Sequence, residues 1–309
     1  GLNNSDGQQP GVSVAKAVGG CAVHNAMVYV RGTPFDFQPG SGWPKRGWEW
    51  GDVLEYYKRS ENSTCHNSGS ASDKHYHSSD GPVQISRPAF ADVVGDAFED
   101  AATRYTGVPR NEDFNGAVRA GAGRYDFLIR RDGKGREIRD AGIDAFWRVG
   151  SRPPNMRLAS GVTATKILLD GGGGLEEGAG KATARGARVL LADGKTEADV
   201  IAMKEIIVSA GAIGTPKLLL LSGIGPAKEL DEVNVTCRSN VSGVGKQFMD
   251  GVCTVMQWKT NASGQLPRHC SPFTLSDPYC AAQWSLYNSG STGNNVSFGF
   301  PGLTRGAFL

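Results

Sequence analysis

Glycine is the residue that most constrains what this chain can fold into. It accounts for 43 of the 309 residues, about twice the usual share of ~7%. Glycine takes positive φ angles and allows close backbone approaches that other residues resist. The sequence therefore predicts many tight turns, most clearly at the Gly19–Gly20 pair and in the run Gly171 to Gly174.

The rest of the composition is that of a soluble globular chain. Its 39% apolar content is enough for a large core and exceeds that of disordered proteins. The 33 basic residues are balanced by 31 acidic ones without a basic block, which argues against nucleic-acid binding by charge alone. The longest aliphatic run, Leu218 to Leu221, is far shorter than the roughly 20 residues of a membrane span.

The cysteines and the N-glycosylation sequons indicate in which cellular compartment the protein resides. The six cysteines include no C-x-x-C pair, so a zinc ribbon or a thioredoxin-type redox pair is not expected, and the thiols are interpreted as buried. Six N-x-S/T sequons exceed the number that chance would give and indicate a secreted or secretory-pathway protein. They begin at Asn3, Asn62, Asn234, Asn240, Asn261 and Asn295. The polar stretch Gly1 to Gly11 contains no signal-peptide core.

Helical patterns dominate the first half of the chain. Apolar residues recur at helix spacing over 21–30 and 88–105, with further helices expected over 53–61, capped by Asp52, and over 139–149. On the helix at 88–105, the expected buried face carries Phe90, Val93, Val94, Ala97, Phe98 and Ala101. The polar segment 60–79 is predicted to be a loop or an insertion.

The second half is richer in strand patterns. Strands are expected over 156–159 and 163–169, and over 188–192 and 197–202 as a hairpin turned at Asp193-Gly194. A short buried strand is expected over 205–209. Thr215 and Pro216 are predicted to start a helix that ends before Gly223. Strands at 253–258 and 295–300 suggest a second domain.

The Gly19–Gly20 turn is the first candidate binding site. A glycine turn that opens a helix places free backbone N–H groups at the helix start, where anions bind well. Periodicity alone also fits a core helix without any ligand.

A second candidate contains several metal-ligand side chains. Cys65, His66, His75 and His77 are residue types that bind zinc. They lie in a Ser/Asn-rich segment without a standard ligand spacing, so we interpret the segment as a solvated loop and predict no metal site.

Two long stretches resemble the signatures of a known family. The first runs from Gly19 to Gly32 and continues from Gly47 to Leu54, and the second runs from Ser209 to Gly225. Both resemble the glucose–methanol–choline (GMC) family of flavin oxidoreductases. Asp113-Phe114-Asn115-Gly116 and the stretch from Gly243 to Asp250 match further family segments in the same order.

The resemblance implies a fold and a chemistry. It implies an α/β chain with a doubly wound, Rossmann-like FAD-binding domain over 1–250, which is incomplete, and the beginning of an α+β substrate domain over 251–309. Such enzymes oxidise an alcohol CH–OH group by hydride transfer to the flavin N5, and O2 or another acceptor reoxidises the flavin. The implied partners are therefore a small alcohol and an electron acceptor. The balanced charge and the short apolar runs predict no nucleic acid partner and no membrane span.

The resemblance also implies site residues. Gly19, Gly20 and Asn25 match positions that hold the FAD pyrophosphate and flavin, within a cofactor-binding set that contains Gly19, Gly20, Cys21, His24, Asn25, Ala26, Met27, Val28 and Val162. Val162 matches the valine whose backbone contacts the adenine. Alternatively, Asn25 is a buried amide satisfied by backbone, and Val162 is an ordinary strand residue. No histidine matches the catalytic base, and Gly251 stands where the family usually has a histidine, so the catalytic residues are unknown.

His24 has two interpretations. The pattern Gly-Gly-Cys-x-x-His-Asn, from Gly19 to Asn25, is similar to the stretch of choline-oxidase-type members whose histidine bonds covalently to the flavin. An imidazole nitrogen can attack an oxidised flavin methyl when the other ring nitrogen is held. The other interpretation is a histidine that lies beside a non-covalent flavin.

Three features depart from the family pattern. No G-x-G-x-x-G follows an N-terminal strand, the C-terminal catalytic stretch is missing, and Gly251 replaces a histidine. We therefore expect an internal fragment of a GMC enzyme that binds FAD weakly and is inactive alone. The alternatives are a GMC-fold lyase, a fatty-acid photodecarboxylase or a non-catalytic remnant.

Overall fold

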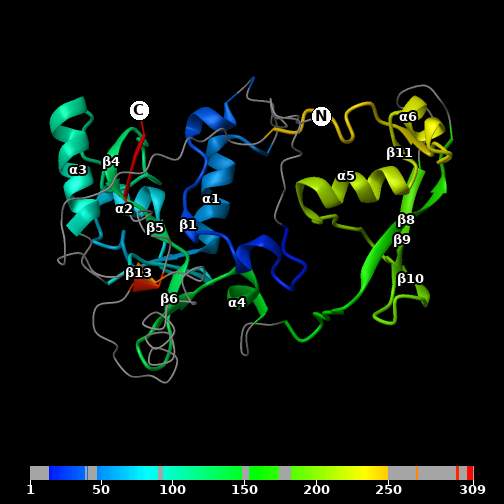
Figure 1. Ribbon diagram of the computed structural model, residues 1–309, viewed down its shortest axis with the longest axis horizontal. Helices are drawn as coiled ribbons and strands as arrows, with labels where there is room; N and C mark the ends of the chain where they lie inside the picture. The colour runs from blue at the N-terminus through cyan, green and yellow to red at the C-terminus, as the bar shows by residue number, and fades with distance from the viewer. Residues whose placement is uncertain are drawn as a thin grey trace. The chain divides into compact units, whose positions relative to one another are not determined.

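The computed structural model places the chain in two compact units. Unit 1 comprises Gly1–Pro154 and Lys259–Leu309, and unit 2 comprises Asn155–Trp258. The structure describes residues 14–38, 40, 47–89, 93–147, 153–173 and 182–249, together with the backbone of three strands at 269–270, 297–298 and 305–308. Figure 1 shows the elements of each unit.

Unit 1 combines short helices with two-stranded sheets. Its helices are η1 (Gly20–Val23), η2 (Pro34–Phe37), α1 (Trp50–Ser60), α2 (Ala71–Tyr76), α3 (Val93–Thr106) and α4 (Gly142–Trp147). Its strands are β1 (Val28–Tyr29), β2 (Glu61–Ser63), β3 (Val83–Ile85), β4 (Gly121–Arg124), β5 (Asp126–Phe127), β6 (Ile129–Arg131), β7 (Glu137–Arg139), β13 (His269–Cys270), β14 (Ser297–Phe298) and β15 (Arg305–Phe308).

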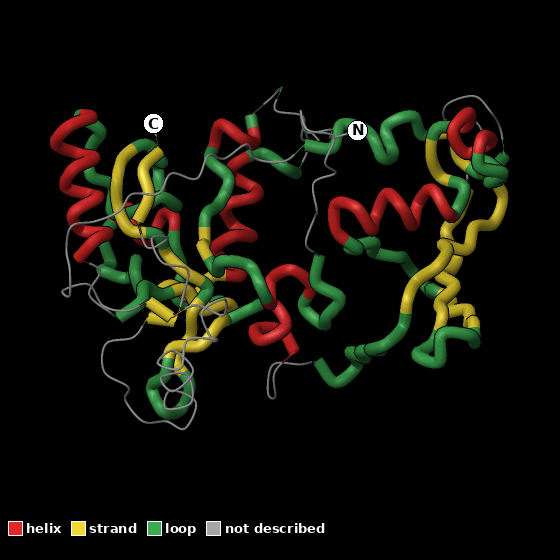
Figure 2. Tube along the Cα trace, in the orientation of Figure 1, coloured by secondary structure: helices red, strands yellow, loops and turns green. Residues whose placement is uncertain are grey.

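The strand pairs of unit 1 bring distant parts of the chain together. β1 pairs antiparallel with β5, and β2 pairs parallel with β3. β4 pairs antiparallel with β15 near the end of the chain, and α3 packs beside this pair (Figure 1). The apolar core contains Leu54, Ile85, Phe114, Ala122, Phe127, Ile129, Ala141 and Ala145. Ile85, Ala122, Phe127 and Ile129 of this core lie on the short strands, and Figure 2 shows strands in yellow.

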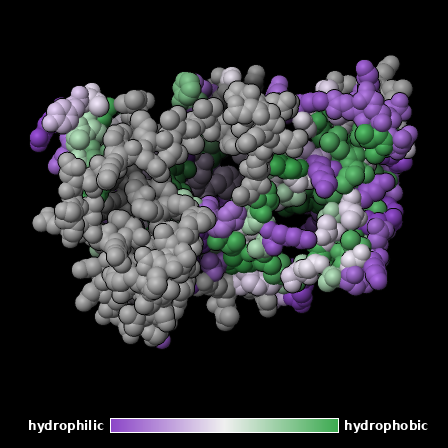
Figure 3. Space-filling model, in the orientation of Figure 1, coloured by the Kyte–Doolittle hydropathy of each residue, from purple (hydrophilic) through white to green (hydrophobic). Residues whose placement is uncertain are grey.

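Unit 2 is built on one antiparallel sheet. β8 (Thr163–Gly171) pairs with β9 (Ala182–Leu190), which pairs with β10 (Glu197–Ile201). α5 (Gly211–Leu221) packs against β8, and the Ile167 N–H donates a 2.7 Å hydrogen bond to Ser222 Oγ just beyond α5. The unit is completed by α6 (Ala227–Glu232) and by the parallel pair β11 (Ile224–Gly225) and β12 (Ser239–Asn240). Apolar side chains gather near α5 and α6 in Figure 3.

The predicted helix over 21–30 is wrong. A 3-10 helix covers only Gly20–Val23, and the chain then enters the two-residue strand β1. Met27 takes a φ of 62°, in the left-handed region that no residue of a right-handed α-helix occupies. The Asn25 side chain holds this bend, because its Oδ1 accepts from the Met27 N–H at 3.0 Å.

The other predicted helices of unit 1 form with shifted ends. α1 starts at Trp50, so Asp52 lies in its first turn instead of capping it. α4 covers Gly142–Trp147 of the expected 139–149. α3 forms, but the predicted buried face is wrong, since Val94 and Phe98 are 40% and 45% exposed. Glu99 is buried on the opposite side and pairs with Arg110.

The hairpin prediction in unit 2 is confirmed. β9 and β10 join through Asp193-Gly194, where Gly194 has a φ of 68°. No strand forms over 156–159 or 205–209 within this described region. Ile207 is 80% exposed, because the apolar run over 205–209 packs against no strand in the part of the chain that the structure describes.

For the helix predicted to start at Thr215, the predicted start is wrong and the predicted end is confirmed. α5 starts four residues earlier than Thr215, at Gly211, and Pro216 lies inside it. Its end before Gly223 is confirmed, with a φ of 82° at that glycine.

Two further predictions concern the chain as a whole. The boundary at residue 250 stays a prediction, and the strand over 253–258 lies outside the described residues. Only Ser297–Phe298 of the strand over 295–300 is described, as β14. Among the described helices, none combines the length and the apolar character that crossing a bilayer requires.

Candidate functional site

Two left-handed glycines shape the first candidate loop. Gly19 has a φ of 99° and Gly20 a φ of 58°, angles at which a side chain is strained. A Cβ atom on Gly19 would also lie 2.7 Å from Val23 Cγ1 and 2.9 Å from Ile143 Cγ2. A Cβ on Gly20 would meet nothing within 4 Å. The loop is therefore packed on its Gly19 side and open at Gly20.

Arg139 clamps the loop from β7. Its Nη1 donates to Ala22 O at 3.0 Å and to Asn25 Oδ1 at 2.6 Å, and its Nη2 donates to Asn25 O at 2.7 Å. Burial lowers the pKa of Arg139, partly offset by Asp144. The guanidinium remains charged, because its ordinary pKa is so high. Arg139 thus places a positive charge under the loop.

Sequence reasoning gave Arg139 no role. It lies 114 residues from Asn25, and no local pattern marks it.

The amide of Asn25 is oriented by its donors. Met27 N–H and Arg139 Nη1 both donate to the same side-chain atom, which identifies that atom as the oxygen Oδ1. The Nδ2 group is then a donor that no partner among the described residues engages. An open glycine turn, an unengaged amide donor and a nearby guanidinium are the groups that an anionic cofactor such as FAD requires. The loop therefore fits that group.

The remaining predicted loop residues have different surroundings. Cys21 is an exposed free thiol. His24 is exposed, and its backbone N–H donates to Cys21 O at 3.2 Å. Ala26, Met27 and Val28 are half-buried. No side chain among the described residues holds either ring nitrogen of His24.

Val162 and the second signature stretch belong to unit 2. Val162 is half-buried and comes directly before β8. In the second stretch, the Ala210 N–H donates to Thr215 Oγ1 at 3.0 Å as α5 begins. Which of these residues contact a cofactor stays a prediction.

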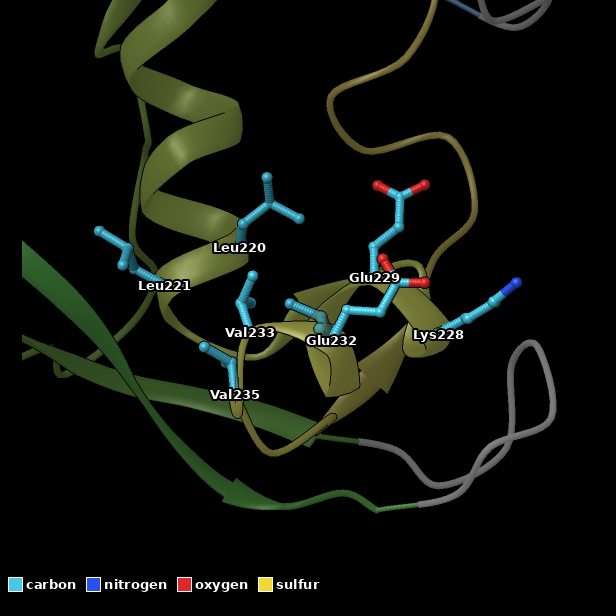
Figure 4. A pocket seen from close by; sticks show the side chains of 8 residues that line it. Leu220, Leu221, Lys228, Glu229, Glu232, Val233 and Val235 are labelled. Atoms are coloured by element: carbon cyan, nitrogen blue, oxygen red, sulfur yellow. The ribbon is translucent and has the colours of Figure 1, made fainter.

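An open pocket of about 610 Å³ lies in unit 2. It is bounded by the end of α5, by α6 and by the turn that follows α6, and Figure 4 shows its lining side chains. Leucine and valine residues form its apolar wall, and Lys228, Glu229 and Glu232 form its polar rim. None of the predicted site residues lines this pocket.

The most unusual feature of unit 1 is a buried polar cluster. We use this name for Arg31, Glu61, His66, His77, Arg87, Asp113, Asn115 and Asp126. Arg31 pairs with Glu61, and both side chains are 1% exposed. Glu61 Oε1 lies 2.8 Å from His77 Nδ1. Sequence patterns identify His66 and His77 as possible ligands and Asp113 and Asn115 as parts of a motif. They give no role to Glu61, Arg87 or Asp126, because the eight residues are spread from residue 31 to residue 126.

Asn115 ties the end of the first signature stretch into this cluster. Its Oδ1 accepts from the Arg31 N–H at 2.8 Å, and its Nδ2 donates to Tyr29 O at 3.1 Å. The Asn115 N–H in turn donates to Asp113 Oδ1 at 2.8 Å. The Asp113-to-Gly116 motif therefore accompanies the first stretch because its Asn115 side chain fixes the backbone of that stretch at Tyr29 and Arg31.

The charges of the cluster shift several pKa values. Burial acts to raise the pKa of Asp113 and of Asp126, but hydrogen bonds and charges from the histidines, and from Arg87 at Asp126, outweigh it. Both carboxyl pKa values therefore lie below their usual range. Burial and the neighbouring Asp126 raise the pKa of the Cys65 thiol to about 12.

The prediction of a solvated loop over 60–79 is wrong. The segment contains β2 and α2, and it buries Glu61, Ser63 and His77. The His66 and His77 side chains are only 8% and 1% exposed. Of the three histidines in this segment, His75 alone is exposed as predicted, and its ring lies edge-on against Tyr76. The histidines are buried because Asp113 and Asp126, distant in sequence, supply their partners.

The thiols of Cys21 and Cys65 are expected to react very differently. The thiolate is the reactive form, and the pKa of about 12 leaves Cys65 protonated near neutral pH. A brief exposure of the native chain to iodoacetamide at about pH 8, followed by peptide mapping, will show Cys21 alkylated and Cys65 protected. Unfolding in denaturant is the control and will expose both. Equal alkylation in the native chain would contradict the buried environment of Cys65.

Comparison with solved structures defines the class of protein. The chain resembles an FAD-dependent oxidoreductase from Chaetomium thermophilum, with a TM-score of 0.67 and 27% identity over 92% of this chain and 47% of that one. It also resembles pyridoxine 4-oxidase from Mesorbium loti, with a TM-score of 0.61 and 27% identity over 74% of this chain and 40% of that one. The fold is thus that of FAD-binding oxidoreductases with mixed helix and strand content, which confirms the predicted fold class.

The family follows from the sequence match. The GMC oxidoreductase family model matches residues 1–253, and the chain belongs to that family. Oxygen-dependent choline dehydrogenase of Brucella anthropi is 31% identical over 91% of this chain and 46% of the relative. The same enzyme of Pseudomonas putida is 27% identical over 97% of this chain and 49% of the relative. The chain spans about half the length of these relatives.

Proposed function

We propose that this chain is part of an FAD-dependent enzyme that oxidises the CH–OH group of a small primary or secondary alcohol. The observation that carries the proposal is the clamped loop from Gly19 to Met27, which lies in a family signature and offers the groups that an anionic cofactor needs. Membership of the GMC family supports it. So do relatives named as choline dehydrogenases and a solved neighbour named as a pyridoxine oxidase.

Several residues of this chain would hold the cofactor. The backbone at Gly19 and Gly20 allows close approach, and Asn25 Nδ2 is available as a donor. Arg139 adds positive charge and fixes the Asn25 amide. When bound, FAD accepts a hydride from the alcohol carbon and passes electrons to an acceptor such as O2. We assign no catalytic base, because no histidine of the chain matches that position.

The activity is tested on the whole protein. Under anaerobic conditions, a suitable alcohol will bleach the absorbance of the bound oxidised flavin, and admission of O2 will restore it if O2 is the acceptor. Choline and pyridoxine are the first alcohols to try, given the names of the relatives. A flavin that no alcohol in a broad panel reduces would contradict the proposal and favour the lyase, photodecarboxylase or non-catalytic alternatives.

The 309-residue chain alone is expected to bind FAD only weakly. It contains no G-x-G-x-x-G turn, so the strand–turn–helix unit that binds the pyrophosphate in dinucleotide folds does not contribute. Fluorescence titration with FAD will give a Kd well above about 1 µM. Micromolar or tighter binding would contradict this expectation.

The same titration tests the loop. Asn25→Ala removes the amide donor and will weaken the residual binding by about 1 kcal/mol. His75→Ala is the matched control, since His75 is an exposed histidine that lies outside this loop. His24 is proposed to lie beside a non-covalent flavin, so acid precipitation of the whole protein will release all of its FAD. Flavin that remains with the precipitate, and is lost in His24→Ala, would show the covalent link.

The sequons support a secretory route as a proposal. In the structure, the asparagines of two of these sequons differ in their exposure to solvent. Asn234 is exposed in the turn after α6, with a φ of 56°. Asn240 is half-buried in β12, and its Oδ1 accepts from the Ala227 N–H at 3.0 Å. Expressed with a secretion signal, the chain will carry glycan at Asn234 and none at Asn240. Glycosidase treatment and mass spectrometry, with Asn234→Gln as control, will show this. Glycan at Asn240 would contradict it.

A further inference from the structure

We propose that His66, His77 and Asp113 form a binding site for one divalent transition-metal cation, with Zn²⁺ as the probe. The site lies within unit 1 and is independent of the proposed alcohol oxidation. One potential ligand atom from each of the three residues lies within 4.8 Å of the other two. Two imidazoles and a carboxylate are a common donor set for zinc.

Asp113 faces both histidines with its two oxygens. Asp113 Oδ2 lies 3.0 Å from His77 Nε2, and Asp113 Oδ1 lies 3.7 Å from His66 Nε2. Ligand atoms that each lie about 2.0–2.2 Å from one tetrahedral zinc ion are separated from one another by distances similar to these two separations. A small rearrangement of these side chains would therefore close the three atoms around an ion.

A second layer of contacts prepares His77 for this role. Glu61 Oε1 lies 2.8 Å from His77 Nδ1. Nδ1 therefore carries the ring proton and donates a hydrogen bond to the carboxylate. Arg31 pairs with the other oxygen of Glu61, so each oxygen of this carboxylate has a partner. A carboxylate behind a metal-binding histidine fixes the ring tautomer in the same way in known sites. In the neutral ring, the Nε2 lone pair then faces Asp113.

This arrangement needs a positive charge between His77 and Asp113. A neutral His77 Nε2 and Asp113 Oδ2 are both acceptors, and they lie only 3.0 Å apart. Either a second proton on the ring or a cation must lie between them. His66 stacks on His77, with ring centroids 4.3 Å apart and an angle of 23° between the planes. Two protonated rings in this stack would repel each other.

The charges around the site favour an added cation. Three carboxylates, Glu61, Asp113 and Asp126, are balanced by two guanidinium groups, Arg31 and Arg87. With both histidines neutral, the cluster is left with an excess negative charge. Asp113 is 22% exposed, so an ion and a water ligand can reach the site from solvent, while the histidines stay buried.

Binding predicts a defined movement. The lone pairs of nearly parallel rings do not converge on one point, so His66 must turn out of its stack on His77. His66 Nε2 must also exchange its 2.9 Å contact with Asp126 Oδ2 for the metal. Asp126 retains its pairing with Arg87 at 2.9 Å, so it is not left as an unpaired buried charge.

The experiment uses the whole 309-residue chain after removal of metal by a chelator. Zn²⁺ will be titrated against a chromophoric competitor, and metal content will be measured after gel filtration. We expect one zinc per chain with a Kd of about 1 µM or tighter. Co²⁺ will give the visible absorption of a low-symmetry nitrogen and oxygen site. Absence of stoichiometric zinc would overturn the proposal.

Variants locate the bound ion. His66→Gln and Asp113→Asn will each weaken zinc binding about tenfold or more. The matched control is His75→Gln, an exposed histidine of the same segment, which will leave the Kd unchanged. Circular dichroism will confirm that each variant is folded. Zinc binding that survives in folded His66→Gln and Asp113→Asn, or that is lost in His75→Gln, would overturn the assignment.

Imidazole resonances of the wild-type chain give a readout that does not depend on a variant folding. Zinc will shift the ring signals of both His66 and His77, and the ring-current effect of their stack will disappear. The proposal fails if zinc leaves the signals of both rings unchanged and His77 is found to carry two protons. A proton, and not a metal, then lies between His77 Nε2 and Asp113.

Discussion

Replacing Arg31 by leucine will lower the free energy of unfolding by about 3–5 kcal/mol, the cost of breaking a buried ion pair from one side. The change leaves the Glu61 carboxylate, 1% exposed, without its guanidinium. It also removes the donor to Tyr76 O and the cation that lies over the rings of Tyr29 and Tyr57. Urea unfolding followed by circular dichroism will measure the loss.

An exposed ion pair of the same unit provides the control. Arg124 and Asp96 lie 3.4 Å apart, with side chains about half exposed. Such pairs contribute about 0–1 kcal/mol, so Arg124→Leu will change the stability little. In the double variant Arg31→Leu/Glu61→Leu, no charge is left unpaired between the two positions, so its loss will be smaller than the sum of the single losses. Equal losses in Arg31→Leu and Arg124→Leu would show that the cluster is not buried as described.

The cluster also determines how stability responds to acid. The pKa values of Asp113 and Asp126 lie below their unfolded values, so their contribution is fully present above an unfolded pKa of about 3.9. It is lost as the pH falls from there through the lower folded pKa values, because the unfolded chain takes up protons first.

Replacing Gly19 by alanine will have the second large effect. The left-handed φ of 99° costs an alanine about 1–2 kcal/mol. The new Cβ also overlaps Val23 and Ile143, and such overpacking costs about 1–3 kcal/mol. We expect a total loss of about 2–5 kcal/mol in urea unfolding, together with loss of the residual FAD binding, because the loop cannot keep its shape.

Gly20→Ala separates these two contributions. Gly20 has a left-handed φ of 58°, but a Cβ there would touch nothing within 4 Å. Its replacement will therefore cost only the backbone term of about 1–2 kcal/mol. If Gly20→Ala destabilises the chain as much as Gly19→Ala, close packing around Gly19 is not the reason for the larger loss.

Local sequence signals succeeded where the structure depends on neighbours along the chain. Asp193-Gly194 between two strand patterns predicted the β9–β10 hairpin, because a short local turn is enough to bring its two flanking strands together. The helix pattern over 21–30 failed for the opposite reason. Met27 is bent by Asn25, and Asn25 is held by Arg139, 114 residues away, so a distant contact overrides the local period.

The histidines show the same limit in the candidate site. Segment 60–79 is polar, and polarity predicts solvent exposure when no partner is visible. His77 is buried because Glu61 and Asp113, 16 and 36 residues away, satisfy its two ring nitrogens. His66 depends on Asp126, 60 residues away. Nothing at these spacings in the sequence identifies such a network.

The sequence by itself determined the family, the glycine loop and the Asp113-to-Gly116 motif, because those features are carried by residue types at fixed local spacing. Only the tertiary structure decided which side chains became buried and paired: the Arg139 clamp on Asn25, the Arg31–Glu61–His77 chain of contacts and the convergence of His66 and His77 on Asp113. The physical reason is that a buried charge is stable only with a partner, and the fold supplies that partner from a distant part of the chain.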